Sequence, residues 1–317
     1  MRKNILLILL VFLMAVPCFA FGTGRKELKE LNISYVRDPF NLPLIIMKEK
    51  QIADRIFAEK GIKVNYFEIS SGAKQSEAIA AGSLHIASVI NTASVILANA
   101  GGNPVEIFGV FSRPEKVFAI MNYNGSVKNP SDLKGKTIAG PKGSFLHELL
   151  VAALVKEGMT IDDVNFINMT IPSGIAAMLS GKVDCCMAAA SSVINAEKAG
   201  AEVVFTCEGY VEPLLVSACG RNFAEKYPDI IDAFKQAKKE SLEWMENNLD
   251  EAIAIAARIQ DISIDEAERL YSWIEYCNTL SDDDLQALDH DIDFMLETGM
   301  IDHPVDKMSF VSERAFR

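Results

Sequence analysis

The stretch Lys136-Thr-Ile-Ala-Gly-Pro-Lys-Gly-Ser144 decides the fold class, because it predicts a short strand that passes through a glycine-rich turn into a helix. Residues 136–139 are rich in apolar and β-branched side chains, as a buried strand requires. Gly140 and Pro141 end that strand, and Ser144 is a preferred cap for a helix that we expect to continue to residue 157. A strand that leads directly into a helix is typical of α/β proteins.

The same succession of strand, small polar turn and helix recurs on both sides of this stretch. Upstream and downstream strands are predicted at 31–36, 62–69, 85–89, 164–168, 183–187 and 203–206. After residue 223 the pattern becomes helical, with apolar residues three and four positions apart in 228–247, 249–259, 264–273 and 282–298. These late helices have no strands of their own to cover. We therefore expect them to pack on the first group of strands.

The chain has 317 residues, which exceeds what one hydrophobic core usually holds. Two α/β units are therefore expected, each a doubly wound, mostly parallel sheet with covering helices. We predict a discontinuous lobe one of residues 28–116 plus 215–317, with lobe two, residues 117–214, inserted between them. Two crossing strands would join the lobes as a hinge.

The first twenty residues have the pattern of a secretory signal peptide. Arg2 and Lys3 precede an apolar run at 5–16, and Ala20 supplies a small residue for cleavage. A membrane anchor is the alternative, but this run is shorter than a spanning helix needs. Acylation of Cys18 is a second alternative, which Pro17 disfavours. We expect a protein of the periplasm or another extracytoplasmic space, held at the membrane only through a partner or through such a lipid.

Composition excludes several function classes. The net charge of -12 makes nucleic acid an unfavourable partner. Charged residues interrupt each hydrophobic stretch after residue 30, and the four histidines and six cysteines show no metal-ligand spacing. Cys185 and Cys186 are adjacent in a predicted strand and point to opposite faces, so buried free thiols are expected rather than a disulfide between them. We predict no metal and no cofactor.

Four segments carry a resemblance to a known family. They are 131–164, which begins Ser-Asp-Leu-Lys-Gly-Lys, 71–87, 177–184 and 227–252. Together they resemble the nitrate, sulfonate and taurine binding proteins, a family that includes binders of thiamine pyrimidine precursors. The resemblance implies the type II periplasmic-binding fold and a monomeric, non-enzymatic solute-binding protein of an ABC importer. Its partners would be a small organic or anionic metabolite and the permease and ATPase subunits.

One departure limits what the resemblance implies about the ligand. Many family members place a tryptophan and an acidic residue near a proline where this chain has Cys186-Met-Ala-Ala-Ala-Ser-Ser192. Small residues there leave room for a bulkier ligand, or remove a stacking wall and a charge partner. Nitrate, taurine or an alkyl sulfonate is therefore not carried over, and we expect either an anionic metabolite, sulfonate-like or nitrate-like, or an aromatic, pyrimidine-like heterocycle.

Ligands of open α/β sheets bind beyond the carboxyl ends of the strands, so the turns at those ends are the candidate site. The candidates are Arg37, Phe40, Ser70, Ser71, Gly72, Asn91 and Thr92 in lobe one, and Lys142, Gly143, Ser144, His147, Ala190 and Ser191 in lobe two. At 142–144, backbone N–H groups and a helix dipole would meet an anion, although Ser144 has the simpler role of a cap. Arg37 could pair with a carboxylate or sulfonate, and Phe40 could stack on a flat ligand.

Several candidates have a purely structural interpretation as well. An exposed loop arginine and a locally packed aromatic are common, and His147 fits a second-layer role better than ligand contact. Two other functions also remain open at this stage: an enzyme on the same fold, related to pyrimidine synthases, and a ligand-sensing module for a membrane receptor.

Overall fold

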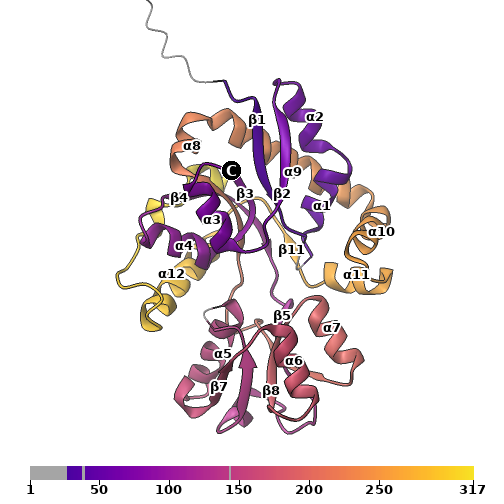
Figure 1. Cartoon of the computed structure of the whole chain (residues 1–317), viewed down its shortest axis with the longest axis vertical. Coiled ribbons are helices and arrows are strands. Elements are labelled where there is room, and N and C mark those ends of the chain that lie inside the picture. Colours follow the sequence, from indigo (N-terminus) through magenta and orange to yellow (C-terminus); the bar gives the residue numbers. More distant parts are fainter. Residues whose placement is uncertain (1–26, 38–39, 143) are drawn as a thin grey trace, which may run out of the picture.

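The computed structural model describes residues 27–37, 40–142 and 144–317. The predicted signal peptide, with Cys18, and the candidate Gly143 lie outside the described residues. Two β-sheets lie one after the other along the long axis of the molecule, and helices cover both of them (Figure 1). The predicted lobe one contains every strand of the first sheet, and the predicted lobe two contains every strand of the second.

The first sheet has six strands in the order β11-β4-β10-β3-β1-β2. Their bounds are β1 (Glu30–Tyr35), β2 (Lys63–Glu68), β3 (Ile86–Asn91), β4 (Val105–Arg113), β10 (Leu215–Gly220) and β11 (Glu275–Tyr276). β1 runs parallel to β2 and β3, whereas β10 is antiparallel to β3 and β4. Leu215, where the chain re-enters this sheet, is paired with Ser112, close to where it leaves.

The second sheet has five strands in the order β7-β6-β8-β5-β9. Their bounds are β5 (Phe118–Asn122), β6 (Thr137–Gly140), β7 (Asn165–Asn168), β8 (Cys185–Ala189) and β9 (Glu202–Thr206). β6 is parallel to β7 and β8, but β5 is antiparallel to β8 and β9. Both sheets are therefore mixed rather than mostly parallel, because the strands next to the two crossings run against their neighbours.

Helices connect the strands within each lobe. In lobe one these are α1 (Leu42–Glu49), α2 (Ile52–Ala58), α3 (Gly72–Ala80) and α4 (Thr92–Ala100), and in lobe two α5 (Phe145–Lys156), α6 (Ile171–Leu179) and α7 (Ser191–Lys198). The single helix expected after residue 42 is divided in two at Gln51, whose φ of 53° is left-handed. Cys185 and Cys186 belong to separate core clusters, as strand alternation predicts, and both thiols are free.

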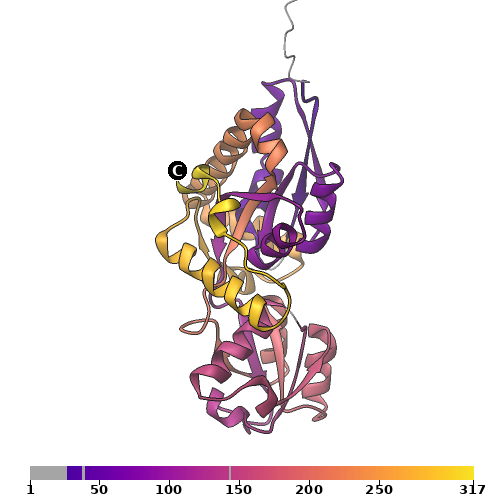
Figure 2. The same cartoon turned by 90° about the vertical axis from the view of Figure 1, so that its left-hand side faces the viewer.

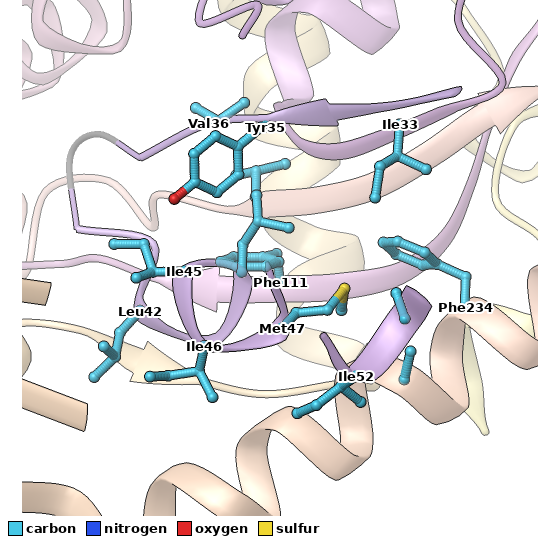
Figure 3. Close-up of a cluster of buried hydrophobic side chains, with 14 of the residues drawn as sticks. Ile33, Tyr35, Val36, Leu42, Ile45, Ile46, Met47, Ile52, Phe111 and Phe234 are labelled. Atoms are coloured by element: carbon cyan, nitrogen blue, oxygen red, sulfur yellow. The ribbon is translucent and has the colours of Figure 1, made fainter. Parts of the chain in front are cut away.

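The C-terminal helices lie around the first sheet (Figure 1). They are α8 (Arg221–Lys226), α9 (Pro228–Asn247), α10 (Leu249–Gln260), α11 (Ile264–Tyr271) and α12 (Asp282–Glu297). α9 packs against α1 and α2, and α12 packs against α4. Figure 3 shows part of the hydrophobic core between this sheet and α9, where Ile33 and Tyr35 of β1 meet α1, Phe111 and Phe234. Burial of such large apolar side chains holds lobe one together.

Besides the chain crossings, two contacts between the lobes are prominent among the described residues. At one, α7 of lobe two meets α11, and salt bridges join Arg269 to Glu197 and Lys198 to Glu266. At the other, the first turns of α5 meet α12, where the rings of His147 and Phe294 lie 6.0 Å apart. We call these the α7/α11 contact and the α5/α12 contact.

Candidate functional site

A cleft with a volume of about 500 Å³ lies between the two sheets, at the carboxyl ends of β3, β6 and β8. Both lobes contribute to its walls. Its polar side chains are Ser70, Ser71, Gln75, Asn91, Ser94 and Ser144, and its larger apolar ones are Val36, Leu97, Phe118, Phe145, Leu146, Ile171, Leu214 and Leu215. A site made of a few polar groups on an apolar wall is typical of small-molecule binding.

Among the helices that begin at this cleft, α3, α4 and α5 have polar caps that are themselves part of its lining. Ser71 accepts a hydrogen bond from the Lys74 N–H of α3, and Asn91 Oδ1 accepts one from the Ser94 N–H of α4. From the other lobe, Ser144 Oγ accepts from the N–H of His147 in α5. The first N–H groups of a helix have no partner within it and carry the positive end of its dipole. Their convergence from both lobes favours a negatively charged group in the cleft.

Gly72 allows two of these helix ends to approach closely. A Cβ atom at this position would lie 2.3 Å from Ser94 Oγ and 2.8 Å from Ser94 Cβ. The first turns of α3 and α4 are therefore in direct contact, and a larger residue at position 72 would push them apart. The glycine that ends the sequence Ser70-Ser71-Gly72 has a packing role in shaping the site.

The cleft carries no charged side chain among its described residues. An anion there would be balanced by backbone N–H groups and hydroxyls rather than by arginine or lysine. Gln75 is 1% exposed and donates from Nε2 to the Val89 carbonyl at 3.0 Å, while its Oε1 has no hydrogen-bond partner. The described residues also contain no group of three histidine, cysteine or acidic side chains that would hold a metal.

Five of the sequence-predicted residues line the cleft together: Ser70, Ser71, Gly72, Asn91 and Ser144. Three more lie at its edge. Lys142 follows the lining residue Pro141 and is exposed, and its N–H donates to Asn168 Oδ1 at 3.0 Å. Ala190 and Ser191 follow the lining residue Ala189 where α7 begins. Ala190 has a φ of 50°, so its backbone is strained next to the cleft.

Two candidates of the loop after β1 do not line the cleft, although Val36, just before them, does. Arg37 lies 3.7 Å from Glu68 and donates to the Ile259 carbonyl, so it ties this loop to the end of α10. Phe40 is fully buried in the lobe one core, where packing outweighs any role in stacking on a ligand. Tyr276 donates its hydroxyl hydrogen to the Phe40 carbonyl.

The two remaining candidates, Thr92 and His147, also do not line the cleft and lie in the region of the α5/α12 contact. Thr92 is fully buried, and its hydroxyl donates to Asp291 Oδ2 of α12. His147 is 5% exposed and lies against Phe166, with 4.9 Å between ring centroids, as well as near Phe294. Burial, with a smaller effect of Lys142, lowers the pKa of His147. Both residues therefore act behind the cleft wall.

Sequence reasoning missed several lining residues. Gln75 and Ser94 lie in the first turns of α3 and α4, three or four positions after each cap. Phe145 directly follows the Ser144 cap, and Phe118 begins β5. The helix periodicity would have found the first two, because residues three and four after a cap share its face. For Phe118 and Phe145 no local pattern distinguishes a cleft wall from a core.

The chain matches the family model described as NMT1/THI5 like over residues 56–252. A Bacillus subtilis protein that is named, provisionally, as an aliphatic sulfonates-binding protein is 29% identical over 96% of this chain and 93% of its own length. The taurine-binding periplasmic protein of Escherichia coli is 32% identical over 58% of each chain.

Among solved structures, the periplasmic aliphatic sulphonate binding protein SsuA of Escherichia coli superposes with a TM-score of 0.81. The superposition covers 90% of this chain and 98% of the SsuA chain at 20% identity, which shows that the two proteins share a fold. In the described part of the chain, no helix has both the length and the apolar character to cross a membrane. The match over residues 56–252 spans all of lobe two and about half of lobe one, which is more than half of the chain, and the chain belongs to the NMT1/THI5-like family.

Proposed function

We propose that this protein is the extracytoplasmic solute-binding component of an ABC importer, and that its ligand is an organic sulfonate with an apolar carbon chain. The observation that carries the proposal is the convergence of three capped helix N-termini from both lobes on an uncharged cleft. The names of the relatives, sulfonate and taurine binders, support the same ligand class.

The chemistry of the walls favours an alkanesulfonate over taurine. A sulfonate head would accept hydrogen bonds from the N–H groups of α3, α4 and α5 and from the cap hydroxyls. Its carbon chain would lie against Phe118, Phe145 and Ile171. The ammonium group of taurine would need an anionic partner, and the described cleft residues offer none. Leaving that charge unpaired in a desolvated site is unfavourable.

Binding is better supported than catalysis. Ser144 Oγ donates its hydrogen to the Pro141 carbonyl at 2.7 Å, so this hydroxyl faces no general base that would activate it as a nucleophile. We therefore propose a non-enzymatic role in the periplasm. A monomer would deliver its ligand to permease and ATPase subunits, and rotation about the two crossings would open and close the cleft.

Calorimetry with a homologous series tests the ligand class. We expect ethane-, butane- and hexanesulfonate to bind with affinity that rises about fourfold per added methylene until the wall is covered, since each buried CH₂ contributes about 0.8 kcal/mol. Taurine, nitrate and a hydroxymethylpyrimidine are the comparison ligands. Stronger binding of taurine than of ethanesulfonate, or binding of the pyrimidine alone, would exclude the proposal.

A pair of variants locates the site. Ser71→Leu combined with Ser144→Leu would fill the space at two helix caps, and we expect loss of sulfonate binding with both lobes still folded. Ser180→Leu is the matched control, because Ser180 is an exposed helix-terminal serine outside the cleft. Unchanged affinity in the double variant would place the ligand elsewhere.

A further inference from the structure

The α5/α12 contact contains two acidic side chains that face each other across the lobes. Glu148 of α5 and Asp291 of α12 are 7% and 5% exposed. Both line one small cavity, together with Ala93, Ser144 and Phe145, and those three residues also line the ligand cleft. Figure 2 shows α12, in yellow, running down toward the lower lobe. The acidic pair therefore lies directly behind the cleft wall.

The two buried carboxyl groups lie beside each other in one cavity, in an arrangement suited to a hydrogen bond that two ionised carboxylates cannot make. Burial raises the pKa of Glu148, and the charge of Asp291 raises it further. Burial also raises the pKa of Asp291, although hydrogen bonds from Thr92 and Glu148 oppose that rise. Because Asp291 already accepts from the Thr92 hydroxyl, it is the natural acceptor, and a protonated Glu148 would be the donor.

The other titratable groups described around this pair are not placed to neutralise its negative charge in place of a bound proton. Cys207 is fully buried, and this burial raises its pKa. On the solvent side a groove also lined by Glu148 and Asp291 carries Lys156, Glu212, His290, Asp293 and Glu297. Lys156 Nζ donates to the Gly209 carbonyl and lies 4.8 Å from the Tyr210 ring. The exposed His290 has only a minor lowering effect on the pKa of Asp291.

We propose that Glu148 and Asp291 share one proton across the lobe interface, so that acidic pH favours the lobe arrangement seen here and with it the ligand-binding cleft. In separated lobes both groups would be hydrated and would ionise near their ordinary pKa of about 4. The contact is thus fully stabilised below that pH and loses its stabilisation as pH rises toward the raised pKa of the pair. One linked proton changes the population ratio by up to about tenfold per pH unit.

Interlobe distances measured without ligand test this directly. We suggest spin labels carried by non-natural amino acids at the exposed positions Glu59 and Lys182, one in each lobe. In the otherwise unchanged protein, the population with the distance of this structure should fall as pH rises from about 5 to about 8. Glu148→Gln should make that population independent of pH, because an amide donates to Asp291 without a bound proton.

Two further variants keep the test decisive. Asp291→Asn should weaken the pH response, because only the effect of burial on Glu148 then remains, so the result does not depend on how well one substitution folds. Asp293→Asn, which neutralises an exposed carboxylate on the same helix, should respond like the unchanged protein. A pH response that is undiminished in both Glu148→Gln and Asp291→Asn, or that is absent from the unchanged protein, would overturn the proposal.

The effect on ligand affinity rests on the proposed function, but the distance measurement does not. Hexanesulfonate affinity should fall over the same pH range in the unchanged protein and stay constant in Glu148→Gln. If distances respond to pH while no sulfonate binds at any pH, the ligand assignment fails and the shared proton stands. If sulfonate binds and the distances do not respond, only the shared proton is refuted.

Discussion

The two contacts between the lobes use opposite electrostatics. At the α7/α11 contact, Arg269 pairs with Glu197 and Lys198 with Glu266, and these side chains remain partly exposed to water. At the α5/α12 contact, two buried acids face each other, and a proton takes the place of a cation. Exposed ion pairs are weak and sensitive to salt, whereas a buried shared proton is sensitive to pH. The same lobe arrangement is therefore held in two chemically separable ways.

The largest effect is expected from removing the Thr92 hydroxyl, which donates a hydrogen bond to Asp291 of the buried acidic pair. Thr92→Val keeps the shape of the side chain but removes the hydroxyl that donates to Asp291. We expect the free energy of unfolding at neutral pH to fall by about 1 to 3 kcal/mol, the cost of leaving a buried polar group without its partner. Denaturant unfolding would measure it, and Thr92→Ser should recover most of the loss. Equal stability of the valine variant would show that Asp291 needs no donor.

A smaller effect is expected from reversing a charge at the exposed contact. Arg269→Glu would place two carboxylates opposite each other where Arg269 now makes bonds of 2.6 and 2.9 Å to Glu197. Since such pairs contribute about 1 kcal/mol or less, the interlobe distance distribution should shift no more than about fivefold. The swapped pair, Glu197→Arg with Arg269→Glu, should restore the original distribution. If the swap fails to restore it, packing of Arg269 on Trp273 matters more than charge.

The two contacts are also expected to respond to acid in opposite directions, because of Glu266 at the α7/α11 contact. Hydrogen bonds from Lys198 and from the Ser263 backbone and hydroxyl lower the pKa of Glu266 to about 2. Its stabilising contribution is therefore present above the ordinary carboxyl pKa and lost as pH falls through about 2, the reverse of the acidic pair. Lys198→Gln should raise this pKa, as measured by NMR titration, but not to its ordinary value, because Ser263 remains. A titration that does not move would assign the shift to the helix cap alone.

Salt should produce the smallest change. Raising the ionic strength from about 0.1 to about 1 M shortens the Debye length from about 10 to about 3 Å. We expect the α7/α11 contact to weaken by a few tenths of a kcal/mol. In Glu148→Gln, where the pH response is removed, distances should still respond to salt. An equal salt response after Lys198→Gln and Arg269→Gln together would assign it to other charges.

Much of the fold follows from local sequence patterns. The strand, turn and helix at 136–157, and the caps Ser71, Asn91 and Ser144, are set by residue types that have few alternatives at those positions. Strand direction is not encoded in such patterns, which explains why mostly parallel sheets were predicted where the structure has mixed ones. The break between α1 and α2 at Gln51 was also missed, because a left-handed glutamine has no sequence signal comparable to glycine.

The candidate site was predictable to the level of turns but not of side-chain directions. Asn91 and Thr92 are consecutive, yet one lines the cleft and the other points away to bind Asp291. Phe40 follows a strand end, as site residues do, but belongs to the core. Glu148 and Asp291 lie far apart in the sequence, and only the packing of α5 on α12 brings them together. Such pairs depend on tertiary structure and leave no local pattern.

The pairing of Ser112 with Leu215 has a consequence for how this molecule can be rebuilt. The chain leaves the first sheet and returns to it at neighbouring positions, so residues 114–214 form an insert whose two ends lie together. A short linker of a few residues would close the gap, and a lobe two from another family member would fit the same two ends. The connectivity thus permits exchange of half the ligand pocket, provided that the hybrid keeps Val117, Ala190 and Ile194, which pack into the larger core.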